Sequence, residues 1–95
     1  MLESDIEAKF RRAVIKAGGL CYKWVSPGQT GVPDRLVIID GKVWGVELKT
    51  ETGRLSPVQH VQLQRLREHG LPCRVLYGLG DVDAFLRELT EGGDG

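Results

Sequence analysis

Residues 33–49 read PDRLVIIDGKVWGVELK. Two apolar, β-prone runs, residues 35–39 and 42–48, flank the dipeptide Asp40-Gly41, which is the strongest short-range signal for a hairpin. The stretch therefore predicts two antiparallel strands joined by a two-residue type I′ turn. Because both faces of this hairpin carry apolar side chains, we expect helices to cover the sheet on both sides.

The register of this hairpin brings two carboxylates together. If Ile39 pairs with Lys42, counting back along both strands places Asp34 directly opposite Glu47. Opposed side chains have Cβ atoms about 5 Å apart, where two full charges repel by roughly 3 kcal/mol at an effective dielectric near 20. Mg²⁺ or Mn²⁺ would remove this repulsion, because such cations prefer hard carboxylate oxygens. The pattern predicts a metal site.

Lys49 lies two residues after Glu47 in the same predicted strand, so both side chains point to one face of the sheet. Phosphodiester hydrolysis needs an activated water and neutralisation of charge on the phosphoryl oxygens, which a metal and an adjacent ammonium supply. Spacing alone leaves a second interpretation open. In that interpretation Glu47 and Lys49 form a solvent-facing pair on an edge strand, and Asp34 only starts a turn.

A first helix is predicted over residues 4–17, where apolar residues recur at helical spacing until a Gly-Gly pair. Ser4 and Glu7 form a capping-box pattern at its start. A strand follows over residues 20–25, and a loop rich in Gly and Pro joins it to the hairpin.

A second helix is predicted to begin after the N-cap Ser56, with proline at its first position and Gln59 as capping-box partner, and to end at Gly70. Residues 73–77 form a short strand, and residues 81–89 form a last helix that begins at an aspartate cap. The element order is then α-β-β-β-α-β-α.

The length of 95 residues fits one domain, predicted over residues 1–89, with residues 90–95 as a disordered tail. Thirteen basic and thirteen acidic residues give a net charge of zero, which argues against nucleic-acid binding by bulk electrostatics alone. No apolar run approaches the roughly 20 residues of a membrane span, and the acidic start lacks a signal-peptide core. We therefore expect a cytoplasmic protein in which Cys21 and Cys73 are reduced and structural.

The order Pro33-Asp34, then Glu47-Leu48-Lys49, resembles the motif of the PD-(D/E)XK nuclease superfamily. Three further blocks, GLCYKW at 19–24, GVPDR at 31–35 and LSPVQ at 55–59, resemble the virus-type replication-repair nuclease domain, VRR-NUC. This resemblance covers roughly residues 3–89, almost the whole chain.

The resemblance implies an α/β fold with a PD-(D/E)XK nuclease-like mixed β-sheet flanked by helices. It implies a metal-dependent endodeoxyribonuclease that uses Mg²⁺ or Mn²⁺. Asp34 and Glu47 match the metal ligands, the Leu48 carbonyl matches an additional ligand, and Lys49 matches the catalytic lysine.

Two further residues match the family's catalytic set. Glu7 matches a first-helix glutamate that often completes the acidic cluster as a metal ligand, although its capping-box pattern with Ser4 offers an equally good alternative. Gln59 matches the family's helix glutamine. Its helical angle lies between those of Leu63 and Leu66 on the inward arc, which favours a side chain that faces the site.

The resemblance also implies partners. Stand-alone members of this kind, often from phage or bacteria, resemble homodimers that act on branched or structured DNA, such as Holliday junctions, during replication, recombination or repair. An alternative is a non-catalytic nucleic-acid-binding module, although it would have no need of the costly acidic pair. Polar and cationic residues near the motif are candidates for nucleic-acid binding, namely Lys23, Ser26, Gln29, Arg35 and Arg54.

Overall fold

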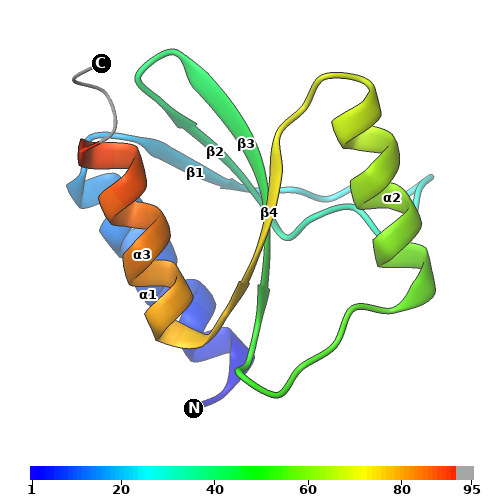
Figure 1. Ribbon diagram of the computed structural model, residues 1–95, viewed down its shortest axis with the longest axis horizontal. Coiled ribbons are helices and arrows are strands. Elements are labelled where there is room, and N and C mark those ends of the chain that lie inside the picture. The colour runs from blue at the N-terminus through cyan, green and yellow to red at the C-terminus, as the bar shows by residue number, and fades with distance from the viewer. Residues whose placement is uncertain (92–95) are drawn as a thin grey trace.

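The computed structural model describes residues 1–91 and contains a four-stranded sheet with helices on both faces (Figure 1). The elements follow the predicted order α-β-β-β-α-β-α. Their bounds are α1 (Glu3–Lys16), β1 (Leu20–Lys23), β2 (Arg35–Ile39), β3 (Lys42–Lys49), α2 (Pro57–Glu68), β4 (Cys73–Tyr77) and α3 (Gly78–Glu91). The predicted α/β fold class is therefore confirmed.

The hairpin of β2 and β3 has the predicted turn and register. Its two turn residues have positive φ angles, 51° at Asp40 and 73° at Gly41, as a type I′ turn requires. The strands are antiparallel, and the last pair in the ladder joins Arg35 to Val46. One residue further along each strand, Asp34 comes opposite the position of Glu47.

The sheet has the strand order β1-β2-β3-β4 and is mixed. β1 pairs with β2 and β2 with β3 in the antiparallel sense, whereas β3 and β4 run parallel. Parallel neighbours need a crossover connection, and α2 lies within it. β3 is consequently an interior strand, and its residues 45–48 are buried.

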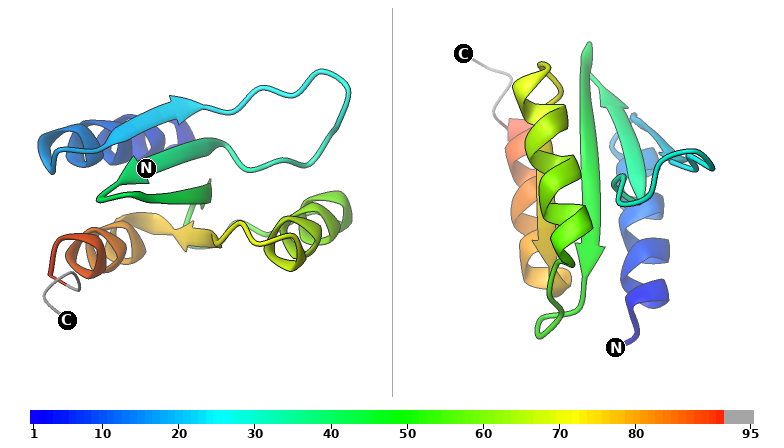
Figure 2. Two further views of the ribbon diagram at one scale, coloured as in Figure 1. Left: turned by 90° about the horizontal axis from the view of Figure 1, so that it is seen from above. Right: turned by 90° about the vertical axis from the view of Figure 1, so that its right-hand side faces the viewer.

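The helices form two layers. α1 and α3 lie side by side on one face of the sheet, and α2 lies on the other (Figures 1 and 2). The core sits under α1 and α3, where the rings of Phe10 and Phe85 are 6.3 Å apart and Val46 and Leu48 are fully buried. Each such side chain contributes about 1.5–3 kcal/mol through burial. Since strand residues alternate, Glu47 points to the opposite face, where α2 lies.

The start of α2 is the predicted one. The backbone N–H of Gln59 donates to Ser56 Oγ (3.2 Å), and Gln59 Oε1 accepts from the backbone N–H of Ser56 (2.9 Å). This reciprocal capping box satisfies two N–H groups that lack helical partners.

The predicted caps of the other two helices are wrong. α1 begins at Glu3, so Ser4 lies inside its first turn, and Asp5 rather than Glu7 accepts from the backbone, from Leu2 N–H at 3.2 Å. α3 begins at Gly78, three residues before the predicted Asp81, because the chain passes from β4 into the helix without a loop. Asp81 Oδ2 instead accepts from the N–H of Tyr77 at 2.9 Å.

Three smaller features concern β1, the end of α3 and the two cysteines. β1 is two residues shorter than the predicted strand 20–25. α3 continues to Glu91, beyond the predicted domain end at 89, and the rest of the predicted tail, residues 92–95, lies outside the described residues. Cys21 and Cys73 are buried and not bonded to each other, as predicted, and no helix within residues 1–91 is long and apolar enough to cross a membrane.

Candidate metal centre

Three carboxylates from three separate segments meet at the end of the β2–β3 hairpin that is remote from its turn. Glu3 from α1, Asp34 before β2 and Glu47 in β3 each offer an oxygen, and these oxygens lie within 4.8 Å of one another. Glu47 is buried, Asp34 is partly buried and Glu3 is exposed. The group is therefore open to solvent on the α1 side and closed on the β3 side.

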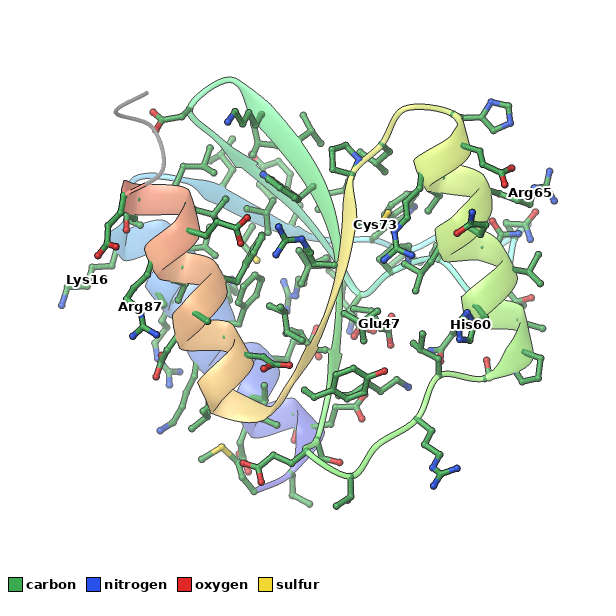
Figure 3. The ribbon with its side chains drawn as sticks, viewed as in Figure 1. Lys16, Glu47, His60, Arg65, Cys73 and Arg87 are labelled. Atoms are coloured by element: carbon green, nitrogen blue, oxygen red, sulfur yellow. The ribbon has the colours of Figure 1, made fainter. Side chains whose placement is uncertain are left out.

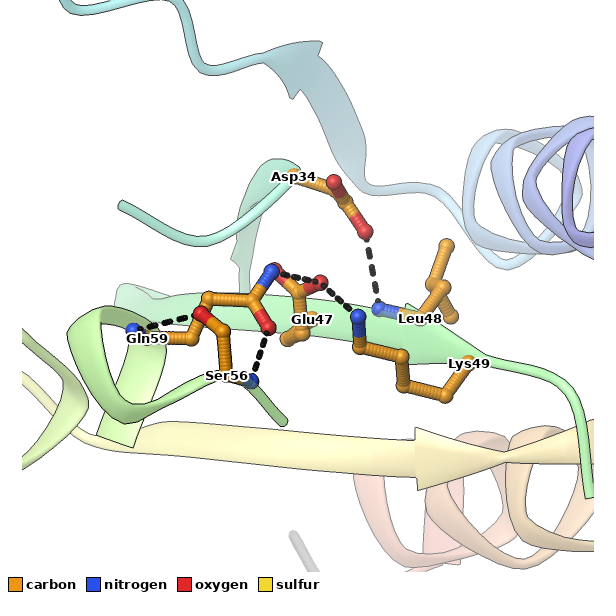
Figure 4. A network of polar contacts seen from close by, with 6 residues as sticks. All are labelled: Asp34, Glu47, Leu48, Lys49, Ser56 and Gln59. Carbon is orange, nitrogen blue, oxygen red and sulfur yellow. Dashed lines mark hydrogen bonds and ion pairs between the residues drawn. The ribbon is translucent and has the colours of Figure 1, made fainter. Parts of the chain in front are cut away.

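Asp34 is fixed to the neighbouring strand by its side chain. Its Oδ2 accepts from the backbone N–H of Leu48 at 2.9 Å (Figure 4). Burial raises the pKa of Asp34 above its ordinary value, the charge of Glu7 raises it further, and the Leu48 N–H lowers it. The hydrogen bond therefore holds the carboxylate in one orientation while its surroundings leave its charge poorly compensated.

Glu47 lies between two polar partners. Its Oε2 accepts from Gln59 Nε2 at 3.1 Å and lies 3.6 Å from Lys49 Nζ (Figure 4). The pKa of Glu47 is raised to about 7, first because burial disfavours its charge and then because Asp34 is near, whereas Lys49 opposes the shift. Figure 3 places Glu47 in the space between the sheet and α2.

The solvent-facing interpretation of Glu47 and Lys49 is wrong. Their side chains are 3% and 13% exposed, and β3 is not an edge strand. The donor set fits a hard divalent cation, because it consists of carboxylate oxygens that repel one another, and because two of the three carboxylates, Asp34 and Glu47, are oriented by hydrogen bonds. Mg²⁺ and Mn²⁺ both suit such oxygens.

Comparisons with known proteins identify similar chains. A solved structure described as "VRR_NUC domain" superposes with a TM-score of 0.83 and 29% sequence identity, covering 90% of this chain and 94% of the other. A protein of Acyrthosiphon pisum secondary endosymbiont phage 1, described as "Putative nuclease p44", is 46% identical over 68 residues, which are 70% of this chain and 67% of the relative. This chain belongs to the VRR-NUC family. No family model matches the chain.

Within this VRR-NUC fold, Gln59 serves two purposes with one side chain. Its Oε1 closes the capping box of α2, and its Nε2 donates to Glu47. The same contact that begins the helix thus orients a carboxylate of the candidate centre.

The first helix supplies a different glutamate from the predicted one. Glu3, which the sequence interpretation did not single out, joins the acidic group, whereas Glu7 Oε1 accepts from Arg35 Nε at 2.9 Å. Glu3 and Glu7 are four residues apart and share one helical face, so their spacing was a signal that either could face the site. Leu48 enters the site through its N–H, which donates to Asp34.

The candidate nucleic-acid contacts of the VRR-NUC chain lie in three places. Lys23 and Arg35 line a hollow beside α1. Ser26 and Gln29 lie in the loop between β1 and β2, where Gln29 is exposed and its Nε2 donates to the carbonyl of Thr30. Arg54 is exposed in the connection between β3 and α2.

Proposed function

We propose that this VRR-NUC chain is a metal-dependent endodeoxyribonuclease that hydrolyses phosphodiester bonds. The observation that carries the proposal is the meeting of Glu3, Asp34 and Glu47 within 4.8 Å, with Lys49 Nζ 3.6 Å from Glu47. A structural domain has no use for an acidic group whose members repel one another and whose buried Glu47 has a raised pKa.

Mg²⁺ or Mn²⁺ would be held by Asp34, Glu47 and Glu3, with the Leu48 carbonyl as an additional ligand. When bound, the cation supplies Lewis-acid activation of water and neutralises charge on the phosphoryl oxygens. Lys49 places an ammonium beside the same carboxylates, where it orients the attacking water and stabilises charge that develops on the phosphate.

Two residues act by positioning in this proposal. Gln59 donates to Glu47 and restricts the orientation of its carboxylate. Glu7 lies one helical turn beyond Glu3 and forms an ion pair with Arg35. In this proposal Glu7 acts by positioning Arg35, and Glu3 is the metal ligand from α1. Gln59 and Glu7 both remain within the predicted catalytic set.

Branched or structured DNA is the proposed substrate, cut by a homodimer during replication, recombination or repair. A domain this small has little surface with which to recognise a junction by itself, so two copies would present two sites to two strands. The phage relative supports action in the cytoplasm of a bacterial or phage-infected cell. In size-exclusion chromatography with light scattering we expect a molar mass of twice the 10.5 kDa of one chain. A molar mass of 10.5 kDa would contradict the homodimer.

The decisive assay incubates the protein with a four-way junction, a flap and plain duplex in Mg²⁺, Mn²⁺ or chelator. We expect cutting with either cation and none with chelator. Lys49→Ala should reduce the rate by about 100-fold or more, whereas Lys16→Ala, an exposed lysine at the far end of α1, should cut as the wild type does (Figure 3). Cutting that survives chelation, or equal cutting by the Lys49 variant, contradicts the proposal. DNA binding without any cutting would support the non-catalytic module.

A further inference from the structure

A hollow of about 300 Å³ lies beside the candidate metal centre, where α1 passes the end of β1 and the start of β2. Four cationic side chains line it, and a single carboxylate faces them. These are Arg11, Arg12, Lys23 and Arg35, opposed by Glu7. In a chain whose formal net charge is zero, this is a marked local excess of positive charge.

Most of this positive charge is not neutralised within the protein. Glu7 is engaged by Arg35, its ion-pair partner at 2.9 Å. Within residues 1–91, Arg11, Arg12 and Lys23 form no ion pair with any carboxylate. A wall of unpaired guanidinium and ammonium groups suits a compact oxyanion, because each guanidinium can donate two parallel N–H groups to a phosphate.

The hollow adjoins the acidic group through the chain itself. Arg35 directly follows Asp34, and Glu7 lies one helical turn beyond Glu3. Next to Lys23, the N–H of Trp24 donates to the carbonyl of Asp34 at 2.9 Å, which ties the end of β1 to the metal centre. Neighbouring residues of the same segments, α1 and the start of β2, therefore contribute to both the acids and the lining of the hollow.

We propose that this hollow binds a non-scissile internucleotide phosphate of the DNA strand that is cut, with Arg11 and Arg12 as its principal ligands. The inference rests on the proposed function, because it takes DNA as the substrate. In this assignment Glu7 is a positioning residue, which holds the Arg35 guanidinium at the wall of the hollow. Phosphate contacts of this kind fix the register of a strand without reading its sequence.

The test compares two double variants in a Lys49→Ala background with Mg²⁺, by fluorescence anisotropy on a labelled junction and duplex. Arg11→Gln/Arg12→Gln removes the proposed ligands. Arg65→Gln/Arg87→Gln is the matched control, since it removes two exposed guanidinium groups from α2 and α3, outside the hollow (Figure 3). Each neutralised phosphate contributes about 0.9 to the slope of log affinity against log salt.

We expect Arg11→Gln/Arg12→Gln to lower that slope by about 1 and to weaken binding by about tenfold, with the control within about twofold of its parent. An unchanged slope, an equal loss in the control, or a parent protein that binds no DNA would overturn the inference. A second probe leaves the protein intact: a single neutral methylphosphonate placed next to the cut bond. The methylphosphonate should weaken DNA binding by the parent protein and cause no further loss of affinity in Arg11→Gln/Arg12→Gln. If the losses from the methylphosphonate and from the two substitutions add up wherever the methylphosphonate is placed, the assignment is contradicted.

The outcomes separate this inference from the proposed function. If wild-type protein cuts DNA only with a divalent cation while the slope of Arg11→Gln/Arg12→Gln equals that of its parent, the nuclease proposal stands. The assignment of the hollow as a phosphate site is then wrong. If the slope falls only for Arg11→Gln/Arg12→Gln and no DNA is cut, the hollow is a phosphate site of a non-catalytic DNA-binding module, and the nuclease proposal fails.

Discussion

Gln59 Nε2 donates to Glu47 Oε2 at 3.1 Å while its own Oε1 accepts from the N-terminal cap of α2. One amide therefore joins the beginning of a helix to the most buried acid of the candidate centre. The orientation of Glu47 therefore depends on the position of the Gln59 side chain at the start of α2.

Replacing Gln59 separates these two roles when it is compared with replacement of its capping partner. Ser56→Ala should cost about 1 kcal/mol of stability, because it removes the N-cap, and should leave the cutting rate within about twofold. Gln59→Ala should cost a similar amount and also reduce kcat by about tenfold, because Glu47 loses its donor. Urea unfolding and single-turnover cleavage measure the two effects. Equal rates in the two variants would show that the amide serves only the helix.

Glu3 and Glu7 can be ranked as metal ligands by isothermal titration with Mn²⁺. Glu3→Gln should weaken binding by about tenfold, because a carboxylate oxygen is lost from the acidic group. Glu7→Gln should change Mn²⁺ affinity by less than about threefold, because this carboxylate is bonded to Arg35. The reverse order of the two variants would assign the ligand to Glu7.

The stability of the metal-free protein should fall as the pH rises. The folded pKa of Glu47 is about 7, above the ordinary value of 4.5, so the folded state holds this proton more tightly than the unfolded chain. The stabilisation is fully present below about pH 4.5 and is lost as the pH rises to about 7. The pKa of Asp34 is also raised above its ordinary value, so its contribution has the same sign.

Chelator-treated wild type and Glu47→Gln, unfolded in urea between pH 4 and 8, test this dependence. The difference in unfolding free energy between the two proteins should change across that interval. At higher pH the variant should become more stable relative to the wild type. Parallel curves would mean that Glu47 ionises in the folded protein as it does in the unfolded chain. Mn²⁺ binding should strengthen over the same interval, because the ligand must lose its proton.

The direct passage from β4 into α3 should depend on glycine at position 78. Gly78 has φ +76°, and a Cβ there would collide with the side chain of Glu51. Gly78→Ala should therefore cost about 1–3 kcal/mol. Gly80→Ala is the control, because a Cβ there meets nothing within 4 Å, and it should be neutral or stabilising by up to about 1 kcal/mol. Thermal unfolding distinguishes the two, and equal melting temperatures would contradict the strain argument.

Local rules were sufficient to predict the hairpin and its register. The turn at Asp40-Gly41 requires positive φ angles that few dipeptides tolerate, and strand residues alternate with a period of two. These two constraints place Asp34 opposite Glu47, and Lys49 on the same face, without reference to any distant residue. The cap of α2 is local for the same reason, since its partners are three residues apart.

Contacts across the fold decided the rest. Which glutamate of α1 reaches the acids depends on how that helix docks, and the docking is set by packing such as that of Phe10 against Phe85, far apart in the sequence. The cationic hollow likewise needs α1, β1 and β2 side by side before Arg11 and Lys23 can face one space. Periodicity gives the face of an element, but its translation and tilt follow from side-chain volumes in the core, and no local rule encodes these.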